Sequence, residues 1–202
     1  MLKQRLFAAF KSLCAIGAMF VLAAPALAQE PDITTQYRNG DAAFRLGHVN
    51  AALQLYTIAC EGGSAYDCYR EGDMHRQGIA TQQSYDAAEA SYSRACELDY
   101  ADACHMLANL RFNGRGLDQD HTVARTLYAR GCDLDSAASC AVLGNMMYVG
   151  MGGPRERQSG ADLMRRSCLQ EVDYACEQVR RYGLSNQGER SNTLRRGWWL
   201  GN

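Results

Sequence analysis

Cysteine is the residue type in this sequence with the greatest capacity for chemistry. The chain of 202 residues contains nine cysteines, and a thiol can form a disulfide, bind zinc or act as a nucleophile. One of them, Cys14, stands apart from a regular series. In that series gaps of 8 and 28 residues alternate, and its members are Cys60, Cys68, Cys96, Cys104, Cys132, Cys140, Cys168 and Cys176.

Disulfide formation fits this spacing better than metal binding. Zinc sites usually place cysteines two to four residues apart, which is closer than the spacing here, so zinc is the weaker alternative. Pairing across 28 residues would leave Cys60 and Cys176 alone at opposite ends, whereas pairing across eight uses every cysteine. We therefore predict four structural disulfides and no metal site. The predicted pairs are Cys60 with Cys68, Cys96 with Cys104, Cys132 with Cys140, and Cys168 with Cys176.

Other residue types with catalytic capacity form none of the familiar motifs. The sequence after Ala28 contains no lysine, which excludes a Ser-x-x-Lys nucleophile, a Lys-Thr-Gly element and a P-loop lysine there. Neither His-Glu-x-x-His nor Gly-x-Ser-x-Gly occurs. The sequence therefore predicts no catalytic residue and no cofactor. The histidines are His48, His75, His105 and His121.

The cysteine spacing defines an internal repeat of 36 residues. The second half of each copy has small or apolar residues at positions i, i+3, i+4, i+7 and i+8, which is one face of an amphipathic helix. One column of this face contains Tyr56, Tyr92, Tyr128 and Met164, and its spacing predicts core residues rather than a stacking platform. The four copies are 33–68, 69–104, 105–140 and 141–176.

The first half of each later copy also has the pattern of a helix. We expect this helix to end at Gly78, Gly114 or Gly150, because glycine readily adopts the positive φ of a helix C-terminus. Ser84 and Asp120 occupy one column after these glycines and are candidate N-caps of the second helix. The sequence thus predicts an all-α fold, a right-handed α-solenoid of antiparallel helix pairs clipped by disulfides. It would span residues 29–183, with a capping helix at 173–183.

The N-terminal 28 residues have the features of a secretory signal peptide. Positive residues precede an apolar run from Leu13 to Ala24, which is shorter than a membrane span, and Ala26-Leu27-Ala28 suits cleavage after Ala28. We expect a periplasmic or secreted protein with no transmembrane segment in its mature form. Cleavage would leave 18 basic and 22 acidic residues, a balance that offers no basic surface for nucleic acid.

The repeat resembles the Sel-1-like repeat, a relative of the tetratricopeptide repeat. The resemblance rests on Leu143-Gly144, Gly114-Arg115-Gly116, Ala124 and Tyr128, and the added Cys-x7-Cys resembles the Helicobacter cysteine-rich protein branch, whose repeats are bridged in this way. The first copy departs from the pattern with Ala42 and a tighter Leu46-Gly47-His48-Val49 connection. The fourth departs with Gly153-Pro154-Arg155-Glu156 and Met164.

The resemblance implies an adaptor or scaffold that binds a protein or an extended peptide in a concave groove. Some cysteine-rich members are associated with penicillin binding and slow β-lactam hydrolysis, so it also implies an alternative function with a β-lactam ligand. Such an enzyme would have to work without the Ser-x-x-Lys mechanism, because the mature chain has no lysine. We therefore expect a binding protein of the cell envelope rather than an enzyme.

A column of polar residues on the first helices supplies the candidate binding residues. Asp73, Asn109 and Asn145 recur at the repeat spacing, with Tyr69 and His105 beside them. Side-chain amides repeated in this way could form hydrogen bonds with the backbone of an extended peptide. The alternative is an ordinary solvated helix face.

The C-terminal tail, residues 184–202, has a different composition from the repeats. It is rich in Ser, Asn, Gln and Gly, and it ends in Leu194-Arg195-Arg196-Gly197-Trp198-Trp199-Leu200 followed by two residues. Because the ends of a solenoid need covering, the tryptophan pair is expected to fold back on the last helices. The alternative is an exposed aromatic anchor for a partner.

Overall fold

The computed structural model describes residues 39–115 and 118–184, and every regular element within these segments is an α-helix. The predicted signal peptide at 1–28 and the tail from residue 185 lie outside the described residues, as do 29–38. The helices are α2 (Gly40–Arg45), α3 (Val49–Glu61), α4 (Ala65–Gln77), α5 (Tyr85–Glu97), α6 (Ala101–Asn113), α7 (His121–Asp133), α8 (Ala137–Val149), α9 (Arg157–Leu169) and α10 (Asp173–Arg181).

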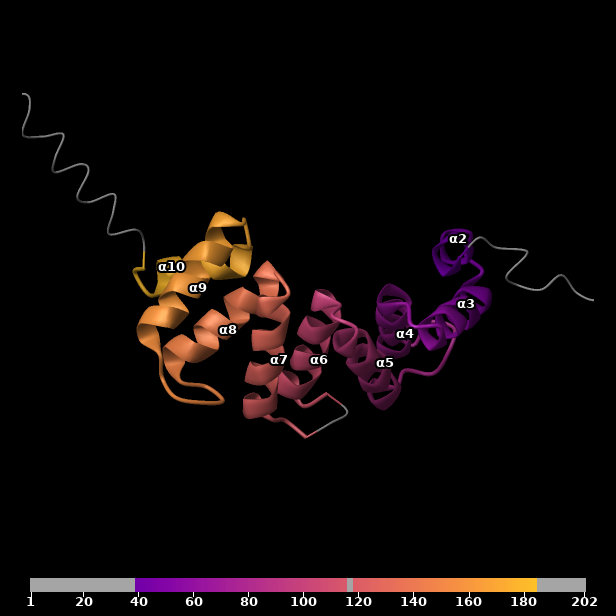
Figure 1. Ribbon diagram of the computed structural model, residues 1–202, viewed down its shortest axis with the longest axis horizontal. Coiled ribbons are helices and arrows are strands. Elements are labelled where there is room, and N and C mark those ends of the chain that lie inside the picture. The colour runs from indigo at the N-terminus through magenta and orange to yellow at the C-terminus, as the bar shows by residue number, and fades with distance from the viewer. Residues whose placement is uncertain (1–38, 116–117, 185–202) are drawn as a thin grey trace, which may run out of the picture. The chain divides into compact units, whose positions relative to one another are not determined.

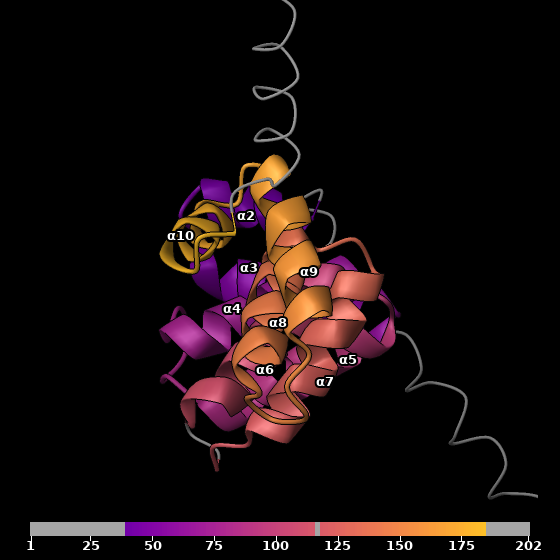
Figure 2. The ribbon, with the colours of Figure 1, turned by 90° about the vertical axis from the view of Figure 1, so that its left-hand side faces the viewer.

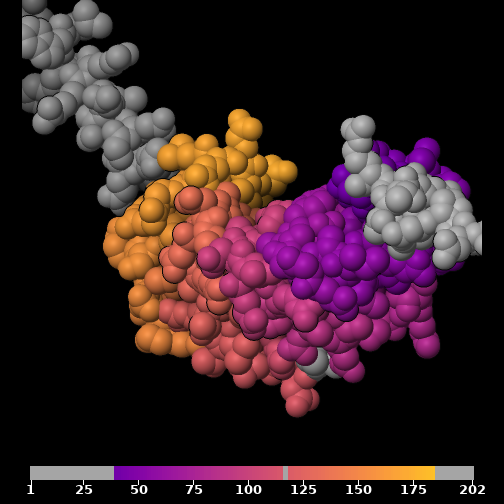
Figure 3. All heavy atoms as spheres, turned by 45° about the vertical axis from the view of Figure 1, so that its right-hand side comes forward, coloured from indigo at the N-terminus to yellow at the C-terminus, as the bar shows by residue number. Residues whose placement is uncertain are grey.

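Each helix packs against the helices that precede and follow it in the sequence, and α10 also contacts α8. Figures 1 and 2 show this serial arrangement of antiparallel neighbours, and Figure 3 shows the atoms of successive repeats following one another across the surface. The predicted all-α architecture of helix pairs is confirmed. Among the helices of the described segments, none combines the length and apolar character needed to cross a bilayer.

Four disulfides join these helices as the cysteine spacing predicts. Their Cα atoms are 4.5 to 4.7 Å apart, within the range that a disulfide requires. Each bridge connects the last turn of one helix to the first turn of the next, and so links the second helix of one copy to the first helix of the following copy. The bridged pairs are α3 with α4, α5 with α6, α7 with α8, and α9 with α10.

The helices begin and end at the residues that the sequence predicts as caps and stops. Gly78, Gly114 and Gly150 end α4, α6 and α8 with φ of 70°, 63° and 83°. The hydroxyl of Ser84 accepts a hydrogen bond from the backbone of α5, and the carboxylate of Asp120 accepts two from α7. These caps are confirmed, and they set the point at which each second helix begins.

The tyrosine column forms the centre of the packing between paired helices. Tyr56, Tyr92 and Tyr128 are at most 1% exposed, so the prediction that they are core residues is confirmed. A Cβ atom added to Gly72 would lie 2.7 Å from the Tyr92 ring, too close for a side chain. The ring therefore lies directly on the backbone of α4, and a glycine is required there.

The first copy reaches the same packing with a shorter turn. Gly47 adopts a φ of 80°, and α3 begins two residues later. Because of this tight turn, Asp41 lies 15 residues before Tyr56, whereas Asp73 lies 19 residues before Tyr92. Asp41 therefore takes the place in the first copy that Asp73 takes in the second.

Candidate functional site

The polar column of the first helices meets the hydroxyl groups of the buried tyrosines. The Tyr92 hydroxyl donates a hydrogen bond to Asp73 Oδ1 at 2.7 Å, and the Tyr128 hydroxyl donates one to Asn109 Oδ1 at 2.6 Å. The Tyr56 hydroxyl donates in the same way to Asp41 Oδ1 at 2.5 Å. A buried hydroxyl needs such a partner, so part of this column serves the fold.

The carboxylate of Asp73 is already occupied by contacts within the fold. Besides Tyr92, it accepts a hydrogen bond from the Arg76 guanidinium at 3.0 Å, and its side chain is only 13% exposed. Burial and the Asp73 carboxylate raise the pKa of Tyr92 above its ordinary value. Burial and the hydrogen bond to Asp73 keep Tyr92 a neutral donor, and the contacts with Tyr92 and Arg76 leave Asp73 little capacity for a ligand.

Asn145 is bonded on both sides of its amide. Its Nδ2 donates to the Tyr174 hydroxyl at 2.8 Å, and its Oδ1 accepts from the Tyr182 hydroxyl at 3.0 Å. Tyr174 lies in α10, and Tyr182 directly follows that helix. The position of Tyr128 is occupied in this copy by Met164, which has no hydroxyl group to bond with Asn145. Asn145 therefore ties α8 to α10 in this structure.

Asn109 retains unused hydrogen-bonding capacity. Its side-chain oxygen accepts the hydrogen bond from Tyr128, but within the described segments its Nδ2 has only a 4.0 Å contact with the sulfur of Met106, which is a weak acceptor. Asn109 is partly exposed. Of the three residues in the polar column, it is the one whose amide donors can still reach a bound molecule.

Tyr69 belongs to a cluster of three tyrosines on α4 and at the start of α6. Its ring centroid is 5.1 Å from that of Tyr100, which is 6.1 Å from that of Tyr66. Burial, followed by the nearby Asp73 and Asp102 carboxylates, raises the pKa of Tyr69 to about 12. We call Tyr66, Tyr69 and Tyr100 the tyrosine cluster.

The sequence analysis did not identify Tyr66 or Tyr100 as site residues. These two tyrosines do not recur at the repeat spacing: the position of Tyr66 is occupied by Asp102 in the next copy, and that of Tyr100 by Ser136. The available signal was the presence of aromatic residues inside two successive Cys-x7-Cys loops. Tyr66 is 40% exposed and its hydroxyl donates to Asp41 Oδ2 at 2.8 Å.

His105 lies beside the column and contacts a serine. Its Nδ1 is 3.1 Å from Ser139 Oγ, and its ring meets the edge of Tyr128 at a centroid distance of 5.5 Å. Burial lowers the pKa of His105, with a smaller opposing effect from Asp102. Ser139 is fully buried, so its hydroxyl is not exposed to a substrate, and the contact links α6 to α8.

The predicted binding residues are thus found in different situations. Tyr69 belongs to the tyrosine cluster, while Asp73, His105 and Asn145 have partners within the fold and Asn109 has spare donors. Their contact with a ligand stays a prediction. In residues 39–115 and 118–184, no three His, Cys, Asp or Glu side chains lie close enough to hold a metal ion.

Comparisons with known proteins connect this arrangement to solved structures. No protein-family model matches the chain, and no curated protein matches it in sequence. A protective antigen of uropathogenic Escherichia coli strains displaying an SLR fold is 20% identical, with a TM-score of 0.63, over 69% of this chain and 30% of its own. A Sel1 repeat protein from Oxalobacter formigenes is 19% identical, with a TM-score of 0.60, over 68% and 61%.

A third similar solved structure is that of a protein named for its cysteine content. Cysteine rich protein B of Helicobacter pylori is 24% identical, with a TM-score of 0.51, over 64% of this chain and 93% of its own. The chain therefore spans less than two thirds of the length of the first two structures and nearly all of the third. These likenesses, together with the four disulfides, establish a disulfide-clipped Sel1-like repeat fold.

Proposed function

We propose that this Sel1-like repeat chain is an exported scaffold that binds an extended segment of a partner protein. The observation that carries the proposal is the tyrosine cluster, which joins the first turns of α4 to the start of α6, the helix that also carries Asn109. Tyrosine offers a large and rigid contact surface at a small cost in conformational entropy, and it is common at binding hot spots. Asn109, the member of the polar column with spare amide donors, adds hydrogen-bonding capacity for a peptide backbone.

The charges beside the tyrosine cluster favour a partner with a basic side chain. Asp102 is exposed and takes part in no ion pair among the described residues, and it lies near the Tyr69 and Tyr100 hydroxyls, whose pKa values it helps to raise. A lysine or arginine side chain can contact a tyrosine ring and a carboxylate together. The proposed ligand is therefore an extended peptide with at least one basic residue.

The disulfides support an oxidising location for this binding activity. Four disulfides persist in the periplasm or outside the cell, whereas thiols stay reduced in most cytosols. The sequence of residues 1–28, with its basic start and apolar run, agrees with export. We propose a periplasmic or secreted protein on these grounds.

The proposal can be tested with peptides selected on the oxidised mature protein. A displayed peptide library yields binders, and fluorescence anisotropy then compares the wild type with Asn109→Asp and Asp102→Asn. Asn109→Asp keeps an acceptor for Tyr128 but replaces the amide donors with a charged carboxylate that can only accept, while Asp102→Asn removes the charge of Asp102. We expect each to weaken binding up to about tenfold. Asp86→Asn is the matched control, because Asp86 is also the exposed second residue of its helix.

Two results would contradict the scaffold proposal. The first is a set of selected peptides that bind all four proteins equally. The second is turnover of the β-lactam nitrocefin that persists after removal of contaminating enzymes. The penicillin-binding alternative, with slow β-lactam hydrolysis, stays a prediction from the family resemblance.

A further inference from the structure

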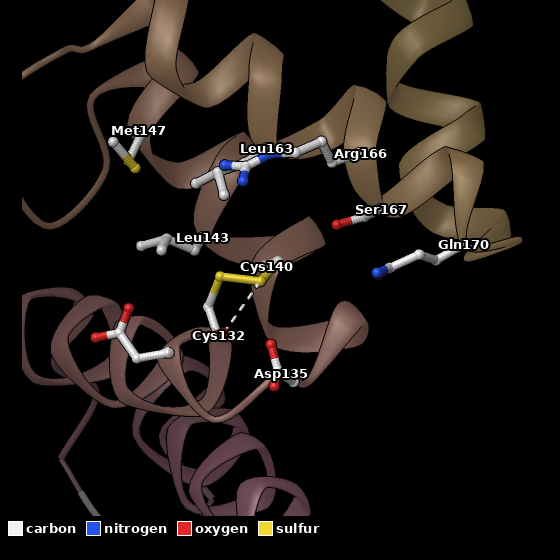
Figure 4. Close-up of a pocket in the computed structure, with 10 residues that line it drawn as sticks. Cys132, Asp135, Cys140, Leu143, Met147, Leu163, Arg166, Ser167 and Gln170 are labelled. Carbon is white, nitrogen blue, oxygen red and sulfur yellow. Dashed lines mark hydrogen bonds between the residues drawn. A yellow bond between two sulfur atoms is a disulfide. The ribbon is translucent and has the colours of Figure 1, made fainter.

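A second candidate surface lies on the other side of α8 from the polar column. It is a cavity of about 480 Å³ between α7, α8 and α9, shown in Figure 4. Leu143, Met147 and Leu163 form an apolar floor next to the Cys132–Cys140 disulfide. Leu143 and Asn145 are two positions apart on one helix, which turns their side chains about 200° from each other.

Several polar groups at this cavity have no partner among residues 39–115 and 118–184. Ser167 is 1% exposed, and its hydroxyl oxygen forms no hydrogen bond with any residue that the structure describes. Figure 4 shows the Ser167 and Gln170 side chains pointing toward the space beside the disulfide. The rim residues Asp133, Asp135 and Arg166 form no ion pair within the described part of the chain. One buried hydroxyl without a partner, beside three exposed charges outside any ion pair, leaves hydrogen-bonding and charge capacity for a bound segment.

The corresponding positions in the earlier repeats are occupied differently. Glu71, His75 and Ser91 replace the three apolar floor residues two copies earlier and line a cavity of about 330 Å³. There Glu71 accepts hydrogen bonds from Thr57 and Ser91. One copy later, Arg130 forms an ion pair with Asp99 at 3.2 Å. Of these three positions, the last one alone combines an apolar floor with an unpaired charged rim.

The described chain leaves the repeats beside α9, one of the helices that line this cavity, on the side of the helix turned away from Leu163. The carbonyl oxygen of Leu184 accepts a hydrogen bond from Arg165 Nε at 2.9 Å, and Arg165 precedes Arg166 on α9. Residues 185–193 can span about 30 Å when extended. The sequence beyond them, Leu194-Arg195-Arg196-Gly197-Trp198-Trp199-Leu200, can therefore reach the cavity.

We propose that residues 194–200 of the same chain dock in the cavity between α7 and α9. The chemistry of the segment matches that of the site, because an indole and a leucine suit the apolar floor and the sulfur of Met147. Arg195 and Arg196 complement the two rim carboxylates, and the Arg166 guanidinium can lie over an indole ring. The segment would thus cover the side of the solenoid formed by α7, α8 and α9. This role is separate from peptide binding at the tyrosine cluster.

Intrinsic tryptophan fluorescence tests this proposal directly, since Trp198 and Trp199 are the two tryptophans of the sequence. The oxidised mature protein should emit at a shorter wavelength, and be quenched less by acrylamide, than the free peptide 194–202. Asp133→Arg reverses one rim charge at an exposed position and should weaken docking about two- to fivefold. Leu163→Arg should release the segment fully, with emission like that of the free peptide.

The repeats supply a matched control. Glu61 occupies the position of Asp133 two copies earlier and is also exposed, so Glu61→Arg should leave the emission unchanged. Wild-type emission identical to that of the free peptide would overturn the proposal. So would a shifted emission that Asp133→Arg and Leu163→Arg leave intact, because the segment would then be bound elsewhere. A shift that disappears on dilution would assign the contact to a second copy and would also overturn it.

Discussion

The first three helix pairs are built around a tyrosine, whereas the fourth is built around a methionine. Tyr56, Tyr92 and Tyr128 are buried, and each hydroxyl donates a hydrogen bond to the first helix of its own pair. Met164 is equally buried but has no such donor, and Asn145 instead bonds with Tyr174 and Tyr182 from the α10 segment. The polar position is kept in all four pairs, but its partner comes from a different helix in the last one.

The close approach of the paired helices differs in the same way. In the second pair, a Cβ atom on Gly72 would meet the Tyr92 ring. In the fourth pair, a Cβ atom on Gly160 would lie 2.5 Å from the backbone oxygen of Gly144. A ring lying on a glycine and a backbone lying on a glycine are therefore two solutions to the same packing requirement. The second solution leaves less room for adjustment, because backbone moves less readily than a side chain.

The largest effect is expected from Gly160→Ala in the fourth pair. The new methyl group would meet the Gly144 oxygen at 2.5 Å and the Tyr148 nitrogen at 2.7 Å, so α8 and α9 must separate. We expect a loss of about 3 kcal/mol in the free energy of unfolding, measured with urea. The matched control is Ala124→Gly in the third pair, which should cost about 1–2 kcal/mol through helix propensity and the loss of one buried methyl group. Equal or increased stability of Gly160→Ala would show that the helices do not approach so closely.

Tyr92→Phe tests the hydrogen bond that distinguishes the first three pairs. Removal of the hydroxyl takes a donor from Asp73 and an acceptor from Arg76, whose Nε lies 3.1 Å from the Tyr92 oxygen. The expected loss is about 1–2 kcal/mol in the same urea measurement. Tyr148→Phe serves as the control, because the Tyr148 hydroxyl forms no hydrogen bond within residues 39–115 and 118–184 and its ring stacks on Tyr182. A loss of the same size in both variants would refute a specific role for the hydroxyl.

Asn145→Ala tests the substitute arrangement in the fourth pair. The change removes the bonds to Tyr174 and Tyr182, which are partly exposed, so the expected cost is about 1 kcal/mol. Because these bonds hold α10, hydrogen exchange should accelerate in Asp173–Arg181 and not in α4 or α5. Asn50→Ala, at an exposed position on α3, is the control. Uniformly faster exchange throughout the chain would argue against a local tie.

The smallest expected effect concerns pH and the third copy. Burial lowers the pKa of His105 below its ordinary value of 6.5, so the unfolded chain binds a proton more readily than the folded one. Stability is therefore complete above about pH 6.5 and decreases as the pH falls through the lower folded-state pKa. Thermal unfolding at a series of pH values should show this decrease, and His105→Gln should flatten it in that interval. An identical pH profile in the variant would exclude His105 as its source.

Much of the fold could be predicted because the 36-residue spacing repeats local signals. The helix ends at Gly78 and Gly114, the cap at Ser84 and the disulfides depend on residues close together in the sequence. The shifted contact of Asp41 in the first copy could not be read in this way, since the shorter turn breaks the register. A comparison of positions 36 residues apart does not detect a change in the length of a turn within one copy.

The candidate site was less predictable because its contacts cross from one repeat to another. The spacing of Asn109 and Asn145 indicates equivalent residues, yet only the packing of α10 shows that Asn145 is already bonded on both sides. Tyr66 and Tyr100 come together from two successive turns, and no periodic signal marks a pair of residues whose types do not recur. The surroundings of a residue in one copy depend on the side chains of the neighbouring copies. Equivalent positions in the sequence give no information about these contacts.

The position of the disulfides also determines how the protein would respond to mechanical force. Each bridge closes a loop between cysteines eight residues apart, so pulling on the chain ends cannot extend these loops. Apart from the segments before Cys60 and after Cys176, extension must come from the 28-residue intervals between bridges, each of which contributes about 100 Å when fully stretched. Under tension, the oxidised protein would thus lengthen in nearly equal steps, and reduction of the cysteines would add the length stored in the loops.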